Sequence, residues 1–523
     1  MTVKLASLES GKISQMSMIL LKRLFILLLI LSLSGTVLAA CVLNPSLDQS
    51  TPALPLPEPQ THILTGTFQP TVSQTPLEPG NAPADFEIPK NIPEYNLDII
   101  LNYYSQYADI TQTITYTNNT GIELQELLLR IPPKYFAGTY IQNSLDVNPA
   151  AAQTDQGLST LLTFDSPLLP DQQAHIHLQY RLVIPKFTRD DGAWTYGASD
   201  QQTNLTNFYP YIPPYKTDTG WLVYDPVYDS VSLPVGENVV NDIANFEVRL
   251  RLTDRPELIE VAASAPMIGV ERSGDYRYRL ELARSFSFSI SDSYFINEVT
   301  EDGVTVRSYS FINNQQAGKD VLELGMNAVK LYGEIIYPYP RPLLSIVVAD
   351  YLHNMEMDGM VMISYGVFDF YKGPKTNLAM LAPHEICHQW FYSLVGNDQA
   401  KEPWLDEALC TYSELLYYER FYPDLVDWWW RNRVNGWQPT GYVNSDILTP
   451  GGYEPYRLAV YLRGAIFMQE LRDTIGDEAF SASLKDYAVA NTYRIATASD
   501  FFAAVSRHSQ TDVQPVIDRF FRN

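Results

Sequence analysis

Cysteine is scarce in this sequence, with 3 cysteines among 523 residues. Cys41 stands at the end of an apolar leader, so only Cys387 and Cys410 are left for the rest of the chain. Two cysteines cannot form the set of disulfides that holds small secreted domains together. The folded part must therefore depend on hydrophobic cores, and a chain of this length can build two of them.

Positive charge is also in short supply. The chain has 36 lysine and arginine residues against 60 aspartate and glutamate residues, and its formal net charge is −24. A surplus of negative charge repels phosphate backbones, which argues against nucleic acid as a partner. The sequence shows neither an internal repeat nor a glycine-rich phosphate loop. These absences argue against repeat architectures and P-loop nucleotide chemistry.

Histidine is rare as well, yet two of the 7 histidines stand four positions apart in the segment His-Glu-Ile-Cys-His. On a helix, His384 and His388 lie on one face, so their ring nitrogens can share one zinc ion. Glu407, on a second predicted helix, can supply the third ligand and leave a fourth position for water. Glu385 can then act on that water as a general base. The pattern predicts a catalytic site with one zinc per chain.

A structural zinc, or a pair of core histidines, is the alternative. Structural zinc normally has four protein ligands, usually including cysteine. Cys387 lies on the flank of the predicted ligand helix, and Cys410 is expected to pack rather than to bind metal. Apolar residues surround the ligand helix, Gly396-Asn397-Asp398 is expected to end it, and residues 404–418 read as a second amphipathic helix. This context favours the catalytic site.

Two segments, His384–Trp390 and Pro403–Leu409, resemble the aminopeptidase N family of gluzincin metallopeptidases. Further segments agree with that family, in its order along the chain: Asn207–Pro210, Asn354–Met357 and Tyr461–Ala465. The resemblance implies an α+β protein in which an antiparallel, β-rich, saddle-like domain precedes a thermolysin-like, mainly helical zinc-peptidase domain. Since the chain stops at Asn523, a short form with an open cleft is expected.

The resemblance also implies roles and substrates. Glu356 and its neighbour Met355 are expected to bind the N-terminal ammonium of a peptide, which is how the family removes residues singly. Tyr461 is expected to stabilise the developing oxyanion, the alternative being a tyrosine of the core. Glu414, two turns beyond Glu407 on the same predicted helix, either orients a zinc-binding histidine or faces solvent without a role.

The chain departs from the family next to these residues. His353 and Asn354 replace the usual glycines, which changes how closely a substrate backbone can approach. Pro383 immediately precedes the first ligand and predicts a kink or a late helix start. Two further hypotheses therefore stand beside the aminopeptidase: a zinc endopeptidase with an altered amine site, and a catalytically silent binding or scaffold module of the cell envelope. The intact ligand set argues against the silent module.

The first residues indicate where the protein acts. Lys22 and Arg23 precede an apolar run that ends in Leu38-Ala39-Ala40-Cys41, a pattern typical of bacterial lipoprotein signals. Residues 1–40 are predicted to be the signal peptide, and a lipidated Cys41 would anchor the protein to the membrane. The alternative is an uncleaved anchor over Leu24–Ala40. Either anchor places the rest outside the cytoplasm, in the bacterial cell envelope.

Composition and periodicity divide the remaining chain. Residues 41–93 are rich in proline, threonine and serine, which is typical of a tether. Residues 94–298 show apolar and polar residues in alternation, as in Phe246–Leu252, and predict the β-rich domain. His175 and His177 share one predicted strand face and are expected to meet solvent. Residues 299–523 are predicted to form the catalytic domain, with these first elements: a strand at Val304–Ser310, a helix at about 321–336 and a strand at Leu343–Ala349.

Overall fold

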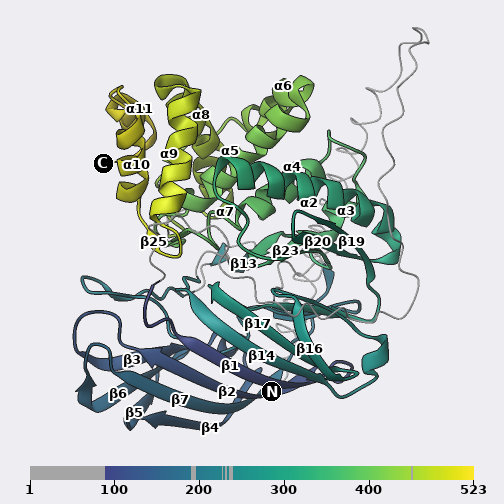
Figure 1. The fold of residues 1–523 in the computed structure, drawn as a ribbon, viewed down its shortest axis with the longest axis vertical. Coiled ribbons are helices and arrows are strands. Elements are labelled where there is room, and N and C mark those ends of the chain that lie inside the picture. The colour runs from purple at the N-terminus through teal and green to yellow at the C-terminus, as the bar shows by residue number, and fades with distance from the viewer. Residues whose placement is uncertain are drawn as a thin grey trace, which may run out of the picture. The chain divides into compact units, whose positions relative to one another are not determined.

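The computed structural model describes residues 89–189, 196–225, 228–229, 232–234, 239–448 and 451–522. Strands dominate the first half of this part and helices the second (Figure 1), which confirms the predicted order of a β-rich part before a mainly helical one. The predicted signal peptide, Cys41 and nearly all of the tether lie outside the described residues. Among the helices that are described, none has the length and apolar character needed to cross a membrane.

A seven-stranded sheet, ordered β16-β17-β14-β1-β2-β7-β4, is the largest element of the β-rich part. Its strands are β1 (Glu94–Asn102), β2 (Tyr107–Thr117), β4 (Tyr140–Asn148), β7 (Gln173–Val183), β14 (Ala244–Leu252), β16 (Met267–Arg272) and β17 (Asp275–Ala283). Buried and exposed residues alternate along β7, and its exposed His175 and His177 contact threonines of β2. Both histidines face solvent, as expected.

Smaller sheets complete this part. One contains β3 (Leu124–Arg130), β5 (Ala151–Asp155) and β6 (Ser159–Leu168), and another contains β8 (Tyr196–Ala198), β9 (Thr203–Leu205), β15 (Glu260–Ala263) and β18 (Phe288–Ser291). Two hairpins are formed by β10 (Tyr215–Lys216) with β11 (Gly220–Trp221) and by β12 (Tyr228–Asp229) with β13 (Ser232–Pro234). Most buried apolar residues from Tyr95 to Ile290 form one core cluster, separate from that of the helical part.

The helical part is built on a five-stranded sheet, ordered β19-β20-β21-β23-β22. Its strands are β19 (Phe295–Glu301), β20 (Val304–Ser310), β21 (Leu343–Ala349), β22 (Met355–Met357) and β23 (Met360–Ser364). Strands β20 and β21 have the predicted bounds. The helix between them, α2, spans Gln315–Ile335 and thus starts earlier than the predicted residue 321. Its first turn is polar, so apolar periodicity could not reveal where it begins.

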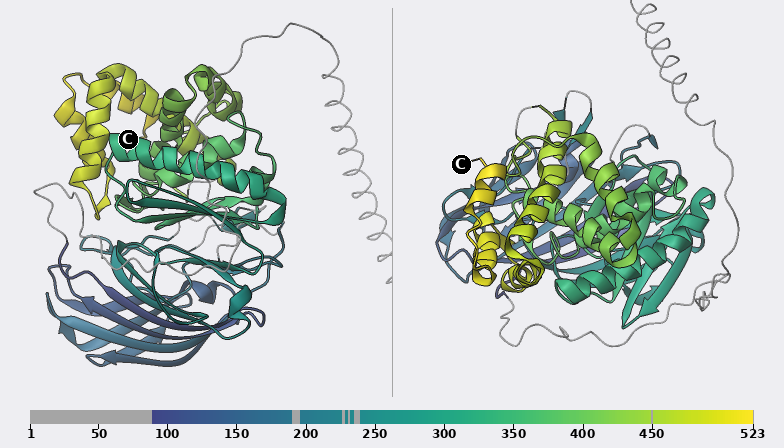
Figure 2. Two further views of the ribbon diagram at one scale, coloured as in Figure 1. Left: turned by 45° about the vertical axis from the view of Figure 1, so that its right-hand side comes forward. Right: turned by 90° about the horizontal axis from the view of Figure 1, so that it is seen from above.

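Helices follow this sheet to the end of the described chain: α3 (Tyr365–Asp369), α4 (Asn377–Cys387), α5 (Trp404–Phe421), α6 (Val426–Trp429), α7 (Tyr453–Arg457), α8 (Arg463–Ile475), α9 (Asp477–Ala490), α10 (Ala498–His508) and α11 (Gln514–Phe520). Helices α2 and α4 lie over one face of the five-stranded sheet (Figures 1 and 2). Helix α4 packs between α2 and α5, and α5 packs in turn on α8. This stacking brings side chains of α4, α5 and the start of α8 together.

Candidate metal centre

The first two predicted ligands stand at the C-terminal end of α4. The helix begins at Asn377, so Pro383 lies inside it and does not mark a late start. The helix ends at Cys387, before the boundary predicted at Gly396-Asn397-Asp398, and that boundary is therefore wrong. Tighter turns replace the helix, since the Trp390 N–H bonds to the Cys387 carbonyl at 2.8 Å. The whole segment is buried, so its apolar sequence continued past the helix without marking the end.

The predicted ligands converge. Nε2 of His384 lies 3.3 Å from Oε2 of Glu407, and Nε2 of His388 lies 3.6 Å from the same oxygen. All three side chains are buried, and their donor atoms lie within 4.8 Å of one another. Donors that bind one zinc tetrahedrally at about 2.0–2.1 Å are separated by about 3.3–3.4 Å. Two imidazoles and one carboxylate at these separations fit a zinc ion and leave one position for water.

Each histidine is oriented through its other ring nitrogen. Nδ1 of His388 lies 3.1 Å from the carbonyl oxygen of Phe391, and Nδ1 of His384 lies 3.0 Å from Oε1 of Glu414. Burial lowers the pKa of His388 well below its usual value. Burial also opposes protonation of His384, but Glu414 and Glu385 outweigh it and raise its pKa. The contacts at Nδ1 point both Nε2 atoms toward Glu407, as metal ligands require.

Glu414 is fully buried on α5, so the solvent-facing alternative is excluded. The Arg433 guanidinium donates to both carboxylate oxygens, with its shortest contact at 2.7 Å, and Nε1 of Trp429 donates at 3.1 Å. Burial opposes ionisation of Glu414, yet Arg433 prevails and lowers the pKa of the carboxyl. Sequence reasoning missed Arg433, which stands three residues after a run of three tryptophans.

Glu385 lies next to the predicted ligands and is buried too. Burial raises the pKa of its carboxyl to about 8. The charges of Glu356 and Glu407 add to that shift, whereas His384 and a hydrogen bond with Asn354 oppose it. A bound cation would favour the ionised carboxylate. A carboxyl pKa raised in this way, beside a group of metal ligands, is typical of a general base.

Glu356 lies on β22, the edge strand of the five-stranded sheet. Its carboxylate comes within 4.8 Å of donor atoms of Glu385 and His388, which joins it to the metal centre. Nε2 of Gln399 donates to Glu356 at 3.3 Å and to the buried Asp406 at 2.9 Å. Nothing in the local sequence pattern singled out Gln399. Met355, also predicted, is half-buried on the same strand.

Tyr461 is half-buried in the turn Leu458–Leu462, immediately before α8. Its ring stacks on that of His384, with centroids 6.1 Å apart and an angle of 14° between the planes. Gly464 explains the approach, since a Cβ there would lie 2.4 Å from the Cβ of Ala408 on α5. The glycine lets α8 come close to α5 and brings Tyr461 to the centre. This position favours a role at the site over a place in the core.

The two remaining cysteines lie nearby without joining the metal-binding group. Both are buried, and Sγ of Cys410 is 4.0 Å from the carbonyl oxygen of Phe391. Within the described ranges, neither cysteine is among the residues whose donor atoms gather closely enough to hold an ion. Their position is that of packing residues, as expected for Cys410.

Comparison with known proteins points to one class. Residues 321–520 match the model of the peptidase family M1 domain. Aminopeptidase M1-D of Oryza sativa subsp. japonica is 26% identical over 244 residues, covering 42% of this chain and 27% of that protein. Human endoplasmic reticulum aminopeptidase 1 is 22% identical over 250 residues, covering 45% and 27%. The chain thus spans about a quarter of the length of these curated relatives.

Solved structures agree. The M1 zinc metallopeptidase from Deinococcus radiodurans has a TM-score of 0.57 at 17% identity and covers 83% of this chain and 93% of its own. A structure of its mutant with a Tyr-Ser-Ala substrate has a TM-score of 0.58 at 16% identity, with coverage of 83% and 94%. The family model and the curated relatives confirm the resemblance to the aminopeptidase N family, and the solved structures show the fold of an M1 metallopeptidase.

Proposed function

We propose that this chain is a zinc-dependent aminopeptidase, a hydrolase that removes residues one at a time from peptides with a free N-terminus. The convergence of His384, His388 and Glu407 carries the proposal, because this donor set fits one zinc ion per chain. Glu385 and Glu356 stand beside these donors. The relatives' names support the same class, since both curated proteins above are aminopeptidases.

Two residues of the chain have separate roles in the proposed reaction. Zinc, when bound, supplies a Lewis acid and lowers the pKa of water. Glu385 holds the proton taken from the water and passes it to the leaving amine. Tyr461, above the His384 ring, donates a hydrogen bond to the oxygen on which negative charge develops. Glu385 acts within a buried centre, where electrostatic interactions are stronger than in water.

Glu356 sets the exopeptidase character. A peptide's free ammonium carries a positive charge, and a carboxylate within 4.8 Å of donors of Glu385 and His388 can hold that charge next to the first peptide bond. Gln399 holds Oε1 of Glu356 at 3.3 Å and so limits its rotation. An acetylated N-terminus lacks the charge and gains nothing from this contact.

The test is kcat/KM for a matched free and N-acetylated peptide pair, in the wild type and in Glu356→Ala. The charge-assisted contact is worth about 1.5–3 kcal/mol, so the wild type should prefer the free peptide by roughly ten- to a hundredfold or more. Glu356→Ala should slow cleavage of the free peptide and leave the acetylated one nearly unchanged. A chelator should abolish both activities. Equal internal cleavage of the acetylated peptide by the wild type would establish an endopeptidase instead.

We further propose a location. The chain acts outside the cytoplasm, anchored in the bacterial cell envelope by lipid on Cys41, with residues 41–93 as tether, 94–298 as β-rich domain and 299–523 as catalytic domain. The Leu38-Ala39-Ala40-Cys41 segment and the proline-rich stretch after it support this proposal. Mass spectrometry of the native protein should find diacylglyceryl-modified Cys41, whereas Cys41→Ser should remain unprocessed. An unmodified, uncleaved N-terminus would contradict it.

A further inference from the structure

The hairpin that carries Glu356 is fixed at its turn. Strands β22 and β23 are joined by Asp358 and Gly359, and Met357 pairs with Met360 across the turn. Gly359 has a φ of +66°, and a Cβ there would lie 2.0 Å from the carbonyl oxygen of Ser264. Only glycine fits this close approach to the β-rich part. The turn therefore contacts the backbone immediately after β15.

Gln389 holds the same turn from the other direction. Its Oε1 accepts a hydrogen bond from the Gly359 N–H at 2.8 Å, and its Nε2 donates to the Met357 carbonyl at 2.8 Å. The side chain is buried, with 1% exposed. Gln389 directly follows the ligand His388, and Met357 directly follows Glu356. A single amide therefore links the ligand-bearing segment to the strand of the amine-binding carboxylate.

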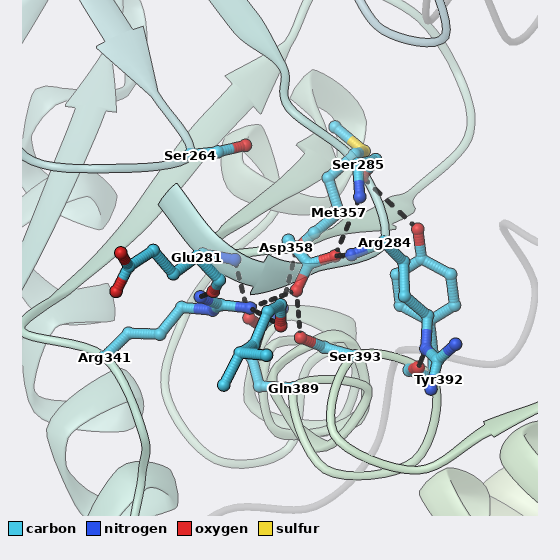
Figure 3. A network of polar contacts seen from close by, with 12 residues as sticks. Ser264, Glu281, Arg284, Ser285, Arg341, Met357, Asp358, Gln389, Tyr392 and Ser393 are labelled. Atoms are coloured by element: carbon cyan, nitrogen blue, oxygen red, sulfur yellow. Dashed lines mark hydrogen bonds and ion pairs between the residues drawn. The ribbon is translucent and has the colours of Figure 1, made fainter. Parts of the chain in front are cut away.

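Asp358 completes the attachment (Figure 3). Its Oδ2 accepts the backbone N–H groups of Arg284 at 2.6 Å and Ser285 at 3.0 Å. Its Oδ1 accepts Nη2 of Arg341 at 2.6 Å and the hydroxyl of Ser393. Asp358 and Arg341 are almost completely buried. These bonds keep the turn attached to its surroundings when Gln389 is changed, so a change at Gln389 alone should shift the hairpin without unfolding it.

We propose that Gln389 is a positioning residue that sets the place of Glu356 relative to the metal centre, and thereby the preference for free N-termini. This inference rests on the proposed function. Gln389 touches neither substrate nor the reacting atoms in this role. It fixes the backbone on both sides of Asp358, and through Met357 it fixes the strand on which Glu356 stands.

The experiment is a double-mutant cycle with Gln389→Met, which keeps the side-chain length but removes both hydrogen bonds. In the full-length enzyme, kcat/KM for the free peptide should fall about tenfold, mainly through KM, as two hydrogen bonds are lost. The acetylated peptide should change by less than about twofold, and one zinc per chain should remain. In the Glu356→Ala background, Gln389→Met should change kcat/KM for the free peptide by less than about twofold, because the group it positions is gone.

Several results would overturn the inference. An equal loss in both backgrounds would show that Gln389 does not act through Glu356, and a loss of zinc would show that it acts through His388. Unchanged kcat/KM would remove any role. If Gln389→Met does not fold, Gln389→Glu enters the same cycle, because it keeps the acceptor for the Gly359 N–H. Failure of the proposed function is distinguishable, since the wild type itself would then show no preference for the free peptide.

A matched control comes from the β-rich part. Gln112 is another fully buried glutamine with two bonds, since Nε2 donates to the Pro210 carbonyl at 2.8 Å and Oε1 accepts the Tyr180 hydroxyl at 2.9 Å. Gln112→Met should lower the thermal midpoint and leave the ratio of free to acetylated cleavage unchanged. A shift of that ratio in Gln112→Met as large as in Gln389→Met would mean that general loosening explains both, and would overturn the inference.

Discussion

Two buried clusters of charge lie side by side in this fold and are balanced in different ways. Asp358 meets cations and donors of the chain itself, with the Arg341 guanidinium at 2.6 Å and backbone N–H groups at 2.6 and 3.0 Å. The metal centre instead gathers Glu385 and Glu407 around two histidines. Buried charge is stable only when it is compensated. The charge of Asp358 is compensated by groups of the chain itself. The metal centre instead gathers the donor groups of a site that binds a cation.

The pKa values follow the same contrast. Burial opposes protonation of Arg341, but Asp358 outweighs it and raises the arginine's pKa. At the metal centre, burial and neighbouring carboxylates raise the pKa of Glu385 to about 8. Neighbouring groups thus stabilise the charged form of Arg341 in the first cluster and disfavour the charged form of Glu385 in the second. Perturbation of this second kind is typical of a catalytic group.

The largest effect is expected when the proposed general base, Glu385, is removed from the metal centre. Glu385→Gln keeps the shape of the side chain and the three zinc donors, but it cannot take a proton. We expect kcat to fall by about 10²–10⁴-fold while one zinc per chain remains. Steady-state kinetics and metal analysis check this. Glu126→Gln, at an exposed position of β3, should behave as the wild type; full activity of Glu385→Gln would contradict the assigned role.

The first cluster should respond in stability. Asp358→Asn leaves Arg341 buried beside a neutral amide, and such a loss costs about 3–5 kcal/mol. Urea unfolding should show this decrease with zinc stoichiometry unchanged. Glu334→Gln is the control, because its pair with Arg420 is exposed and should contribute under about 1 kcal/mol. Equal costs at the two sites would refute the view that Asp358 belongs to a buried, self-compensated cluster.

Tyr461 adjoins the second cluster, since its ring stacks on that of His384. Tyr461→Phe removes one donor to the developing oxyanion and should lower kcat by about 10²–10³-fold, with little change in KM. Tyr180→Phe provides a core comparison, since Tyr180 is buried in the β-rich part; it should cost stability and spare kcat. If both variants affected only stability, Tyr461 would be a core residue.

Local sequence patterns predicted the metal ligands but not the residues that hold the surrounding segments in place, for a physical reason. The predicted ligands sit at helical spacing or on the next helix, and strands such as Leu343–Ala349 are short apolar runs with clear ends, so local patterns suffice. The partners of Asp358 stand up to 74 residues away. Arg433 reaches Glu414 from 19 residues along the chain. Such long-range pairs leave no periodic signal, and a wholly buried segment hid the end of α4.

The smallest expected effect concerns Glu414, which contacts both a histidine of the metal centre and a buried arginine. Glu414 faces His384 at 3.0 Å, like a residue of the metal centre, and Arg433 at 2.7 Å, like Asp358 with its arginine. Glu414→Gln keeps the volume but weakens the hold on the His384 ring. Residues that orient zinc ligands typically contribute about 10–100-fold to metal affinity. We expect a zinc affinity lower by that factor, with kcat at saturating zinc changed by no more than about twofold.

Competition with a chromophoric chelator measures this affinity, and a control from the same helix makes it specific. Glu419 also stands on α5 and pairs with an arginine, Arg472, at 2.9 Å, but that pair is partly exposed. Glu419→Gln should leave zinc affinity unchanged. If both variants lose zinc equally, the arginine pairs stabilise α5 as a whole, and Glu414 has no particular part in orienting His384. If neither loses zinc, the Phe391 and Glu407 contacts hold the ligands in place without Glu414, and its charge serves only to balance Arg433.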